Sequence, residues 1–90
     1  MGYRSALMIG NAHAHDVAKI HGILKEYRSL CDVVLTSTRD EVADVIARRK
    51  DYEVYIAVGG DGTLNSVANA LIDDGRDAIL GVAPSGSGND

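Results

Sequence analysis

Short apolar runs alternate with helical patterns along the chain, and this alternation constrains the fold more than any other feature. The clearest apolar run, Glu53–Val58, is rich in β-branched and aromatic residues. Three more runs have the length and composition of strands: Ser5–Ile9, Asp32–Thr36 and Ala78–Val82. Between the runs, apolar residues recur at the spacing of amphipathic helices, over Asp16–Leu30, Arg39–Lys50 and Leu64–Ile72. Strands that alternate with helices in this way predict right-handed crossovers and a parallel sheet.

The predicted fold class is an α/β domain of three layers, with a mostly parallel sheet and helices on both faces. Ninety residues are enough for one such domain. The strands are almost continuously apolar, as expected when helices cover both faces. In open α/β sheets, ligands bind beyond the carboxyl ends of the strands. Three turns and one strand end are predicted to lie at that edge: Gly10–His15, Gly59–Thr63, Pro84–Asp90 and Thr36.

The composition narrows the classes of function. The net charge of −4 argues against nucleic-acid binding through bulk electrostatics and against a polybasic membrane anchor. The aromatic residues are four tyrosines, so stacking platforms for single-stranded nucleic acid are not predicted. The single cysteine, Cys31, begins an apolar run and is interpreted as a buried, inert thiol. No apolar run approaches the length of a membrane span, and the expected location is cytoplasmic.

A glycine-rich turn between a strand and a helix is the strongest functional signal. Residues 57–65 read AVGGDGTLN. Glycines let backbone N–H groups approach a ligand closely, and the start of a helix attracts anions, so the turn suits a phosphate. Thr63 is predicted to cap the helix and to reach a phosphate oxygen. Asp61 either is a solvated turn residue or has a task beside the phosphate, holding Mg²⁺ or ordering a hydroxyl that will be phosphorylated.

Two familiar nucleotide motifs do not explain this turn. The P-loop pattern is absent and no lysine lies near the turn, and the dinucleotide fingerprint G-x-G-x-x-G is also absent. A second cluster, His13 and His15 beside Asp16, offers too few ligands to favour a metal site and is typical of a solvated loop. No metal-ligand set is predicted among these residues.

Two segments together resemble a known family. The segments GGDGTLNSVANAL and GVAPSGSGND are similar to motifs of the diacylglycerol kinase catalytic domain, which sphingosine kinases and bacterial lipid kinases share. NAD kinases and 6-phosphofructokinases share GGDGT, but the segment PSGSGND at this distance favours the lipid kinases. The resemblance covers the whole chain. It implies the fold of the amino-terminal domain of the NAD kinase and diacylglycerol kinase group.

The resemblance implies a nucleotide site at named positions. Asn11, Thr36 and Ser87 would contact ATP from neighbouring strand ends, and Asp61 would act near the γ-phosphate through Mg²⁺ or the acceptor hydroxyl. Asn89 and Asp90 would support the last turn. The ATP phosphates would be bound by the glycine turn and the start of its helix: Gly59, Gly60, Asp61, Gly62, Thr63, Leu64 and Asn65.

The sequence departs from the family pattern at several points. Ala12 stands where the family has proline, Ser66 where it usually has glutamate, and Ala70 where glycine is common. Family members also have a second, β-rich domain that supplies much of the lipid pocket, a metal site and the general base. That domain is absent from residues 1–90, which are therefore interpreted as the nucleotide-binding part of the catalytic domain. The isolated chain is expected to be inactive or nearly so.

The expected function is the ATP-binding part of a lipid kinase, which transfers the γ-phosphoryl group of ATP to a lipid hydroxyl such as that of diacylglycerol. ATP, Mg²⁺, the lipid and peripheral membrane contact through the full-length enzyme follow from the resemblance, and no nucleic acid partner is expected. Two alternatives stay open. One is a fragment of an NAD kinase-like enzyme. The other is a non-catalytic fragment that binds nucleotide or forms homo-oligomers through its unfinished sheet.

Overall fold

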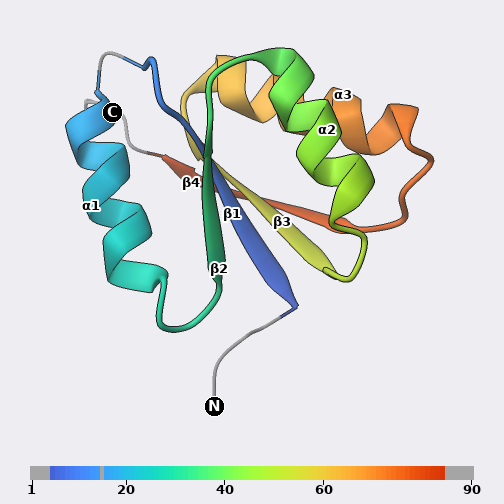
Figure 1. The fold of residues 1–90 in the computed structure, drawn as a ribbon, viewed down its shortest axis with the longest axis horizontal. Helices are drawn as coiled ribbons and strands as arrows, with labels where there is room; N and C mark the ends of the chain where they lie inside the picture. The colour runs from blue at the N-terminus through green and yellow to red at the C-terminus, as the bar shows by residue number, and fades with distance from the viewer. Residues whose placement is uncertain (1–4, 15, 85–90) are drawn as a thin grey trace.

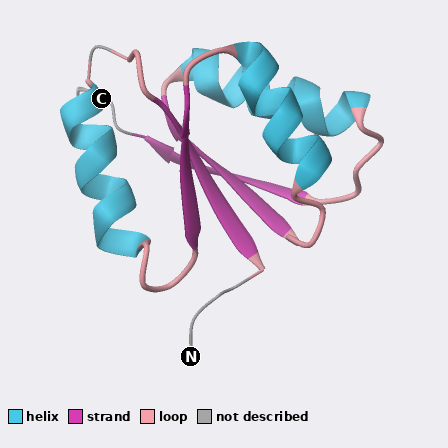
Figure 2. Cartoon of the chain, viewed as in Figure 1, coloured by secondary structure: helices cyan, strands magenta, loops and turns pink. Residues whose placement is uncertain are grey.

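The chain forms a single parallel sheet of four strands with helices on both faces (Figures 1 and 2). The computed structural model describes residues 5–14 and 16–84. The strand order is β2-β1-β3-β4, and the described strand pairs are all parallel. The elements, in chain order, are β1 (Ala6–Asn11), α1 (Val17–Tyr27), β2 (Asp32–Thr36), α2 (Arg39–Arg48), β3 (Val54–Gly59), α3 (Asp61–Asp73) and β4 (Ile79–Pro84). The predicted fold class and element order are confirmed.

Two hydrophobic clusters, one on each face of the sheet, hold the layers together. Of the described helices, α1 covers one face, where Ile20 and Leu24 pack on β1 and β3. Helices α2 and α3 cover the other face, where Ile46 and Val67 pack around the fully buried Tyr55. Since aliphatic side chains from alternate strand positions fill both clusters, the near-continuous apolar character of the strands is explained.

The structure corrects two sequence interpretations at the carboxyl ends of the strands. The predicted turn at residues 10–15 begins later, because Gly10 and Asn11 still belong to β1 and pair with Leu35 and Thr36. A Cβ atom at Gly10 would lie 2.7 Å from Cγ2 of Ile20, so the glycine lets α1 pack directly on the strand.

The second correction concerns the start of α3. The helix begins at Asp61 with Gly60 as its N-cap, so the prediction that Thr63 caps the helix is wrong. The Leu64 amide donates to the Gly60 carbonyl at 3.1 Å, which closes the first turn three residues earlier than predicted. An acidic residue at the first helical position suits the helix dipole, and this favours the early start.

The amino ends of the strands are joined by a hydrogen-bond network around Arg76. This guanidinium donates to the Ile46 carbonyl of α2 at 2.5 Å, to the Asp74 carboxylate at 2.5 and 3.1 Å, and to the hydroxyl of Tyr55. The Tyr55 hydroxyl donates to the Arg49 carbonyl, and the guanidinium carbon lies 5.6 Å from the centre of the Tyr55 ring. Arg76 therefore satisfies the last carbonyls of α2 from the loop after α3.

No helix among the described residues is both long and apolar enough to cross a membrane.

Candidate functional site

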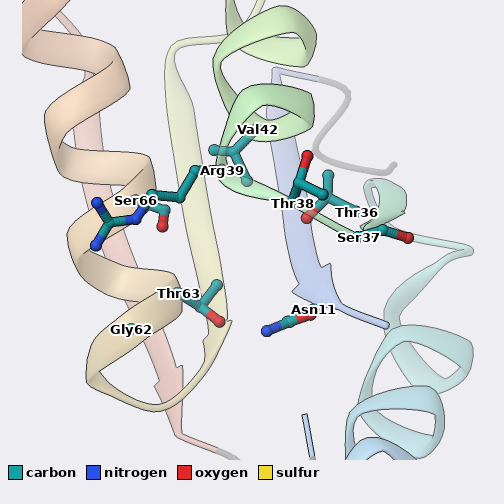
Figure 3. Close-up of a pocket in the computed structure, with 9 residues that line it drawn as sticks. All are labelled: Asn11, Thr36, Ser37, Thr38, Arg39, Val42, Gly62, Thr63 and Ser66. Carbon is teal, nitrogen blue, oxygen red and sulfur yellow. The ribbon is translucent and has the colours of Figure 1, made fainter. Parts of the chain in front are cut away.

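A cleft lined mostly by polar residues lies at the carboxyl ends of β1 and β2, between the first turns of α2 and α3 (Figure 3). Its volume is about 220 Å³, below the roughly 300–1,000 Å³ of a typical ligand pocket. An open cleft of this size can hold part of a nucleotide and cannot enclose a whole one. The residues that line it are Asn11, Thr36, Ser37, Thr38, Arg39, Val42, Gly62, Thr63 and Ser66.

The end of β1 places the Asn11 amide at the mouth of the cleft. Its Oδ1 accepts a hydrogen bond from the His13 amide at 2.8 Å. This bond assigns the other end of the side chain as the amino group, which points across the cleft toward Thr63 in Figure 3. Asn11 therefore offers two N–H donors to an anionic or carbonyl group in the cleft.

Thr36 ends β2 with its side chain buried, only 3% exposed. Its hydroxyl donates to the Gly10 carbonyl at 3.2 Å, and its own carbonyl accepts from the Ala12 amide at 2.7 Å. Because the hydroxyl proton is already used, Thr36 can offer a ligand only the lone pairs of its oxygen. It is suited to a donor such as an amino group rather than to a phosphate.

The first turn of α2 forms the second wall of the cleft. Thr38 is the N-cap, and its Oγ1 accepts from the Glu41 amide at 3.1 Å, while a Glu41 carboxylate oxygen accepts from the Ser37 amide. This arrangement is a variant of the capping box, in which the glutamate accepts from the amide before the N-cap, and it fixes the start of the helix. Arg39 follows, and Figure 3 shows its side chain reaching toward Ser66 on α3. Neither of the two ion pairs found among the described residues involves Arg39.

The first turn of α3 forms another wall of the cleft, and three glycines shape it. Gly59 has a φ of 142°, which L side chains rarely adopt, and a Cβ atom there would lie 3.1 Å from Oγ1 of Thr63. A Cβ atom at Gly60 or Gly62 would meet no atom within 4 Å. The backbone at these two positions is therefore open to a ligand, and the free N–H groups of the first helical turn lie there.

The structure brings together four of the predicted site residues in the cleft: Asn11, Thr36, Gly62 and Thr63. Gly60 and Asp61 are exposed beside it at the helix start and do not line it. Gly59 is buried under the turn, Leu64 packs against the core, and Asn65 is exposed on the helix. Ser87, Asn89 and Asp90 lie outside the described residues.

Sequence reasoning missed the α2 side of the cleft, namely Ser37, Thr38, Arg39 and Val42, and it noted Ser66 only as a departure from the family pattern. A usable signal was present, because Thr38 and Glu41 have the spacing of a capping box directly after a strand. The strand order puts β1 between β2 and β3, and so places the α2 start beside the α3 start. The order of strands in the sheet cannot be predicted from the spacing of residues in the sequence alone.

Fold and site together define a class: α/β domains whose ligand site lies at the carboxyl edge of a parallel sheet, between helix N-termini. The sequence of residues 9–90 matches the diacylglycerol kinase catalytic domain family. The chain belongs to this family. The match supports the lipid kinase interpretation of the sequence over the NAD kinase-like alternative.

Individual relatives agree with this family. Over 44 residues, the chain is 46% identical to a diacylglycerol kinase of Staphylococcus haemolyticus and 48% identical to a lipid kinase YegS-like protein of Klebsiella pneumoniae. These alignments cover 49% of the chain but only 13% and 15% of the two relatives. A solved structure assigned as a diacylglycerol kinase from Bacillus anthracis superimposes on the whole chain with a TM-score of 0.68 and 22% identity. The superposition supports the fold of this chain, which spans 35% of the length of that structure.

Proposed function

We propose that this chain is the nucleotide-binding part of an ATP-dependent lipid kinase, which transfers the γ-phosphoryl group of ATP to a lipid hydroxyl such as that of diacylglycerol. The observation that carries the proposal is the cleft in which two helix N-termini, the Asn11 amide and the Thr63 hydroxyl face one space. Positioning and charge neutralisation supply most of the catalysis in phosphoryl transfer, and this cleft supplies donors for both.

In the proposal, part of the ATP molecule lies in the cleft and its phosphates lie at the start of α3. Gly60 and Gly62 leave their backbone uncovered, and the dipole of α3 favours negative charge there. Asn11 would donate to a phosphate or ribose oxygen, and Thr36 would accept from the amino group of the base. In the proposal, Gly59 to Asn65 form the phosphate loop, while Ser87 contributes from the last turn.

Mg²⁺ fits this site as an ion shared with the nucleotide rather than as one held by the protein alone. No group of three or more histidine, cysteine, aspartate or glutamate side chains that could hold a metal occurs among residues 5–14 and 16–84. Mg²⁺ usually keeps several waters and binds through one or two carboxylates and the substrate phosphates. Asp61, exposed at the first position of α3, is the carboxylate that would hold it. When bound, the ion would neutralise charge on the transferring phosphoryl group.

The remaining parts of the proposal concern the enzyme to which this chain would belong. The lipid pocket and the general base would come from a β-rich second domain, and the enzyme would work in the cytoplasm with peripheral contact to the membrane. Residues 1–90 alone would bind nucleotide and leave the lipid unphosphorylated. The proposed catalytic role of Asp61 would then depend on that second domain.

An amide chemical-shift titration of the ¹⁵N-labelled chain with Mg-ATP tests the nucleotide site. We expect the largest shifts at Gly60, Asp61, Gly62 and Thr38, with smaller shifts for Mg-ADP. The variant Asp61→Asn should bind ATP without Mg²⁺ as the wild type does and should lose the gain that Mg²⁺ gives. Shifts confined to other parts of the chain, or none, would contradict the proposal.

A further inference from the structure

A second groove lies on the opposite face of the sheet, between α1 and the edge strand β2. Its volume is about 380 Å³. The residues that line it are His21, Gly22, Leu24, Lys25, Arg28, Val33, Val34 and Leu35. None of them belongs to the cleft of the proposed nucleotide site. The proposed function therefore leaves this groove without a role.

One wall of the groove is a row of basic side chains. His21, Lys25 and Arg28 follow one another at helical positions i, i+4 and i+7 of α1, so they lie on one flank of the helix. All three are exposed, and no acidic residue lines the groove. Neither ion pair of the described residues involves them. Lys25 and Arg28 place two positive charges on this wall of a chain of net charge −4, and this favours an anionic partner.

The other wall is β2, which is an edge strand of the sheet that the described residues form. The Thr36 carbonyl accepts a hydrogen bond from the Ala12 amide on the side of β1. Successive residues of a strand direct their backbone N–H and C=O groups to opposite sides. The backbone groups of Val33 and Leu35 therefore face away from β1. The side chains of Val33 and Leu35 are half-buried against the α1 cluster and form the floor of the groove. No proline or charged residue interrupts positions 33–35 to protect this edge.

From these two walls we infer that the groove docks an extended, acidic segment of another protein, which adds a parallel or antiparallel strand to β2. Backbone hydrogen bonds to Val33 and Leu35 would supply affinity, and acidic side chains facing α1 would supply specificity. The spacing of side chains on a docked strand would match that of the basic row. Alternate residues of a strand lie about 6.6 Å apart, and positions i and i+4 of a helix lie about 6 Å apart. A segment with an acid at every second position would therefore meet Lys25 and its neighbours in the row.

The same features argue against two other occupants. A second copy of this chain, paired through β2 about a two-fold axis, would bring the basic row of one copy beside that of the other. Like charges so placed disfavour the pairing. A bilayer surface fits poorly because the apolar floor, Val33 and Leu35, is half-buried below the helix flank and is not exposed on a protruding face.

The test uses the ¹⁵N-labelled chain and a synthetic peptide of alternating glutamate and threonine, with a lysine–threonine peptide as control. We expect amide shifts and slowed hydrogen exchange at Val33 and Leu35 with the glutamate peptide and none with the lysine peptide. The double variant Lys25→Glu/Arg28→Glu should weaken binding about tenfold or more. Lys19→Glu, a single charge reversal on α1 outside the groove, should leave binding unchanged, and Lys25→Glu alone is its matched comparison. Added salt should weaken binding in the wild type.

The competing occupants give distinct results. Equal binding of both peptides, or shifts that avoid β2, would overturn the inference. So would dimerisation of the chain at micromolar concentration in light scattering with protection of β2, or co-sedimentation with phosphatidylglycerol vesicles that blocks the peptide. Mg-ATP binding should be the same in wild type and Lys25→Glu/Arg28→Glu, so the outcome here is independent of the proposed nucleotide site.

Discussion

The two ends of the parallel sheet use their polar groups in opposite ways. At the amino ends of the strands, Arg76, Tyr55 and Asp74 satisfy one another and the last carbonyls of α2. At the carboxyl ends, Asn11, Arg39 and the first turn of α3 present donors that the fold does not use. The contrast teaches that substitutions in the Arg76 network should change stability and spare binding, whereas those that remove or cover the unused donors at the carboxyl ends should do the reverse.

The largest expected effect follows from removing Arg76. The variant Arg76→Ala leaves the Ile46 carbonyl without its donor and the Tyr55 hydroxyl without one of its partners, so we expect a loss of about 2–3 kcal/mol in the free energy of unfolding. Urea denaturation measures this loss. Affinity for Mg-ATP, corrected for the folded fraction, should change less than about threefold, which is about 0.6 kcal/mol. Arg76→Lys should restore part of the stability. If Arg76→Ala lost more free energy of Mg-ATP binding than of unfolding, the contrast between the two ends of the sheet would be contradicted.

At Gly59, a substitution should lower both the stability of the fold and the affinity for Mg-ATP. The variant Gly59→Ala must hold a φ of 142° and places a Cβ atom 3.1 Å from the Thr63 hydroxyl, so we expect a cost of about 1–3 kcal/mol. The strained turn should also displace Thr63 and weaken Mg-ATP binding. Thermal unfolding and calorimetric titration measure the two effects. Gly62→Ala, which meets no atom within 4 Å, is the control and should keep the stability of the wild type.

The capping box of α2 should give an intermediate effect. Thr38→Ala removes the oxygen that accepts from the Glu41 amide, and we expect about 1 kcal/mol of destabilisation, seen in urea denaturation. Thr38→Ser keeps that oxygen and should behave as the wild type does. If Thr38→Ala were as stable as the wild type, the capping box would not fix this wall of the cleft.

The smallest effect concerns Cys31, which directly precedes the amino end of β2. Burial, with a smaller contribution from Asp32, raises the pKa of the thiol above its usual value of 9.0. The folded state therefore favours the neutral thiol. The stability that this preference contributes is fully present below pH 9.0 and is lost as pH rises through the pKa of the folded state. The pH profile of reaction with a disulfide reagent should have a higher midpoint in the folded chain than in guanidinium. A lower midpoint in the folded chain would contradict this.

The sequence was sufficient to predict the order and type of every element, because the periodicities of strands and helices differ clearly. It also predicted the strand-to-helix turn at the glycines, because glycines directly after an apolar strand are typical of such a turn. The start of α3 was misplaced because Asp-Gly is typical of turns as well as of first helical turns. The role of Arg76 could not be predicted, since its partners Ile46 and Tyr55 are distant in the sequence and meet only once α2 and α3 are packed.

The central claim is that the uncovered backbone at the start of α3 binds the phosphates of a nucleotide. Calorimetric titration of Mg-ATP into the wild type, Gly60→Val and the control Gly22→Val tests it most directly. A side chain meets no protein atom at either glycine, so both variants should fold. We predict that Gly60→Val abolishes the binding seen in the wild type and that Gly22→Val retains it. Equal affinity in Gly60→Val and the wild type, or no binding by the folded wild type, would contradict the account.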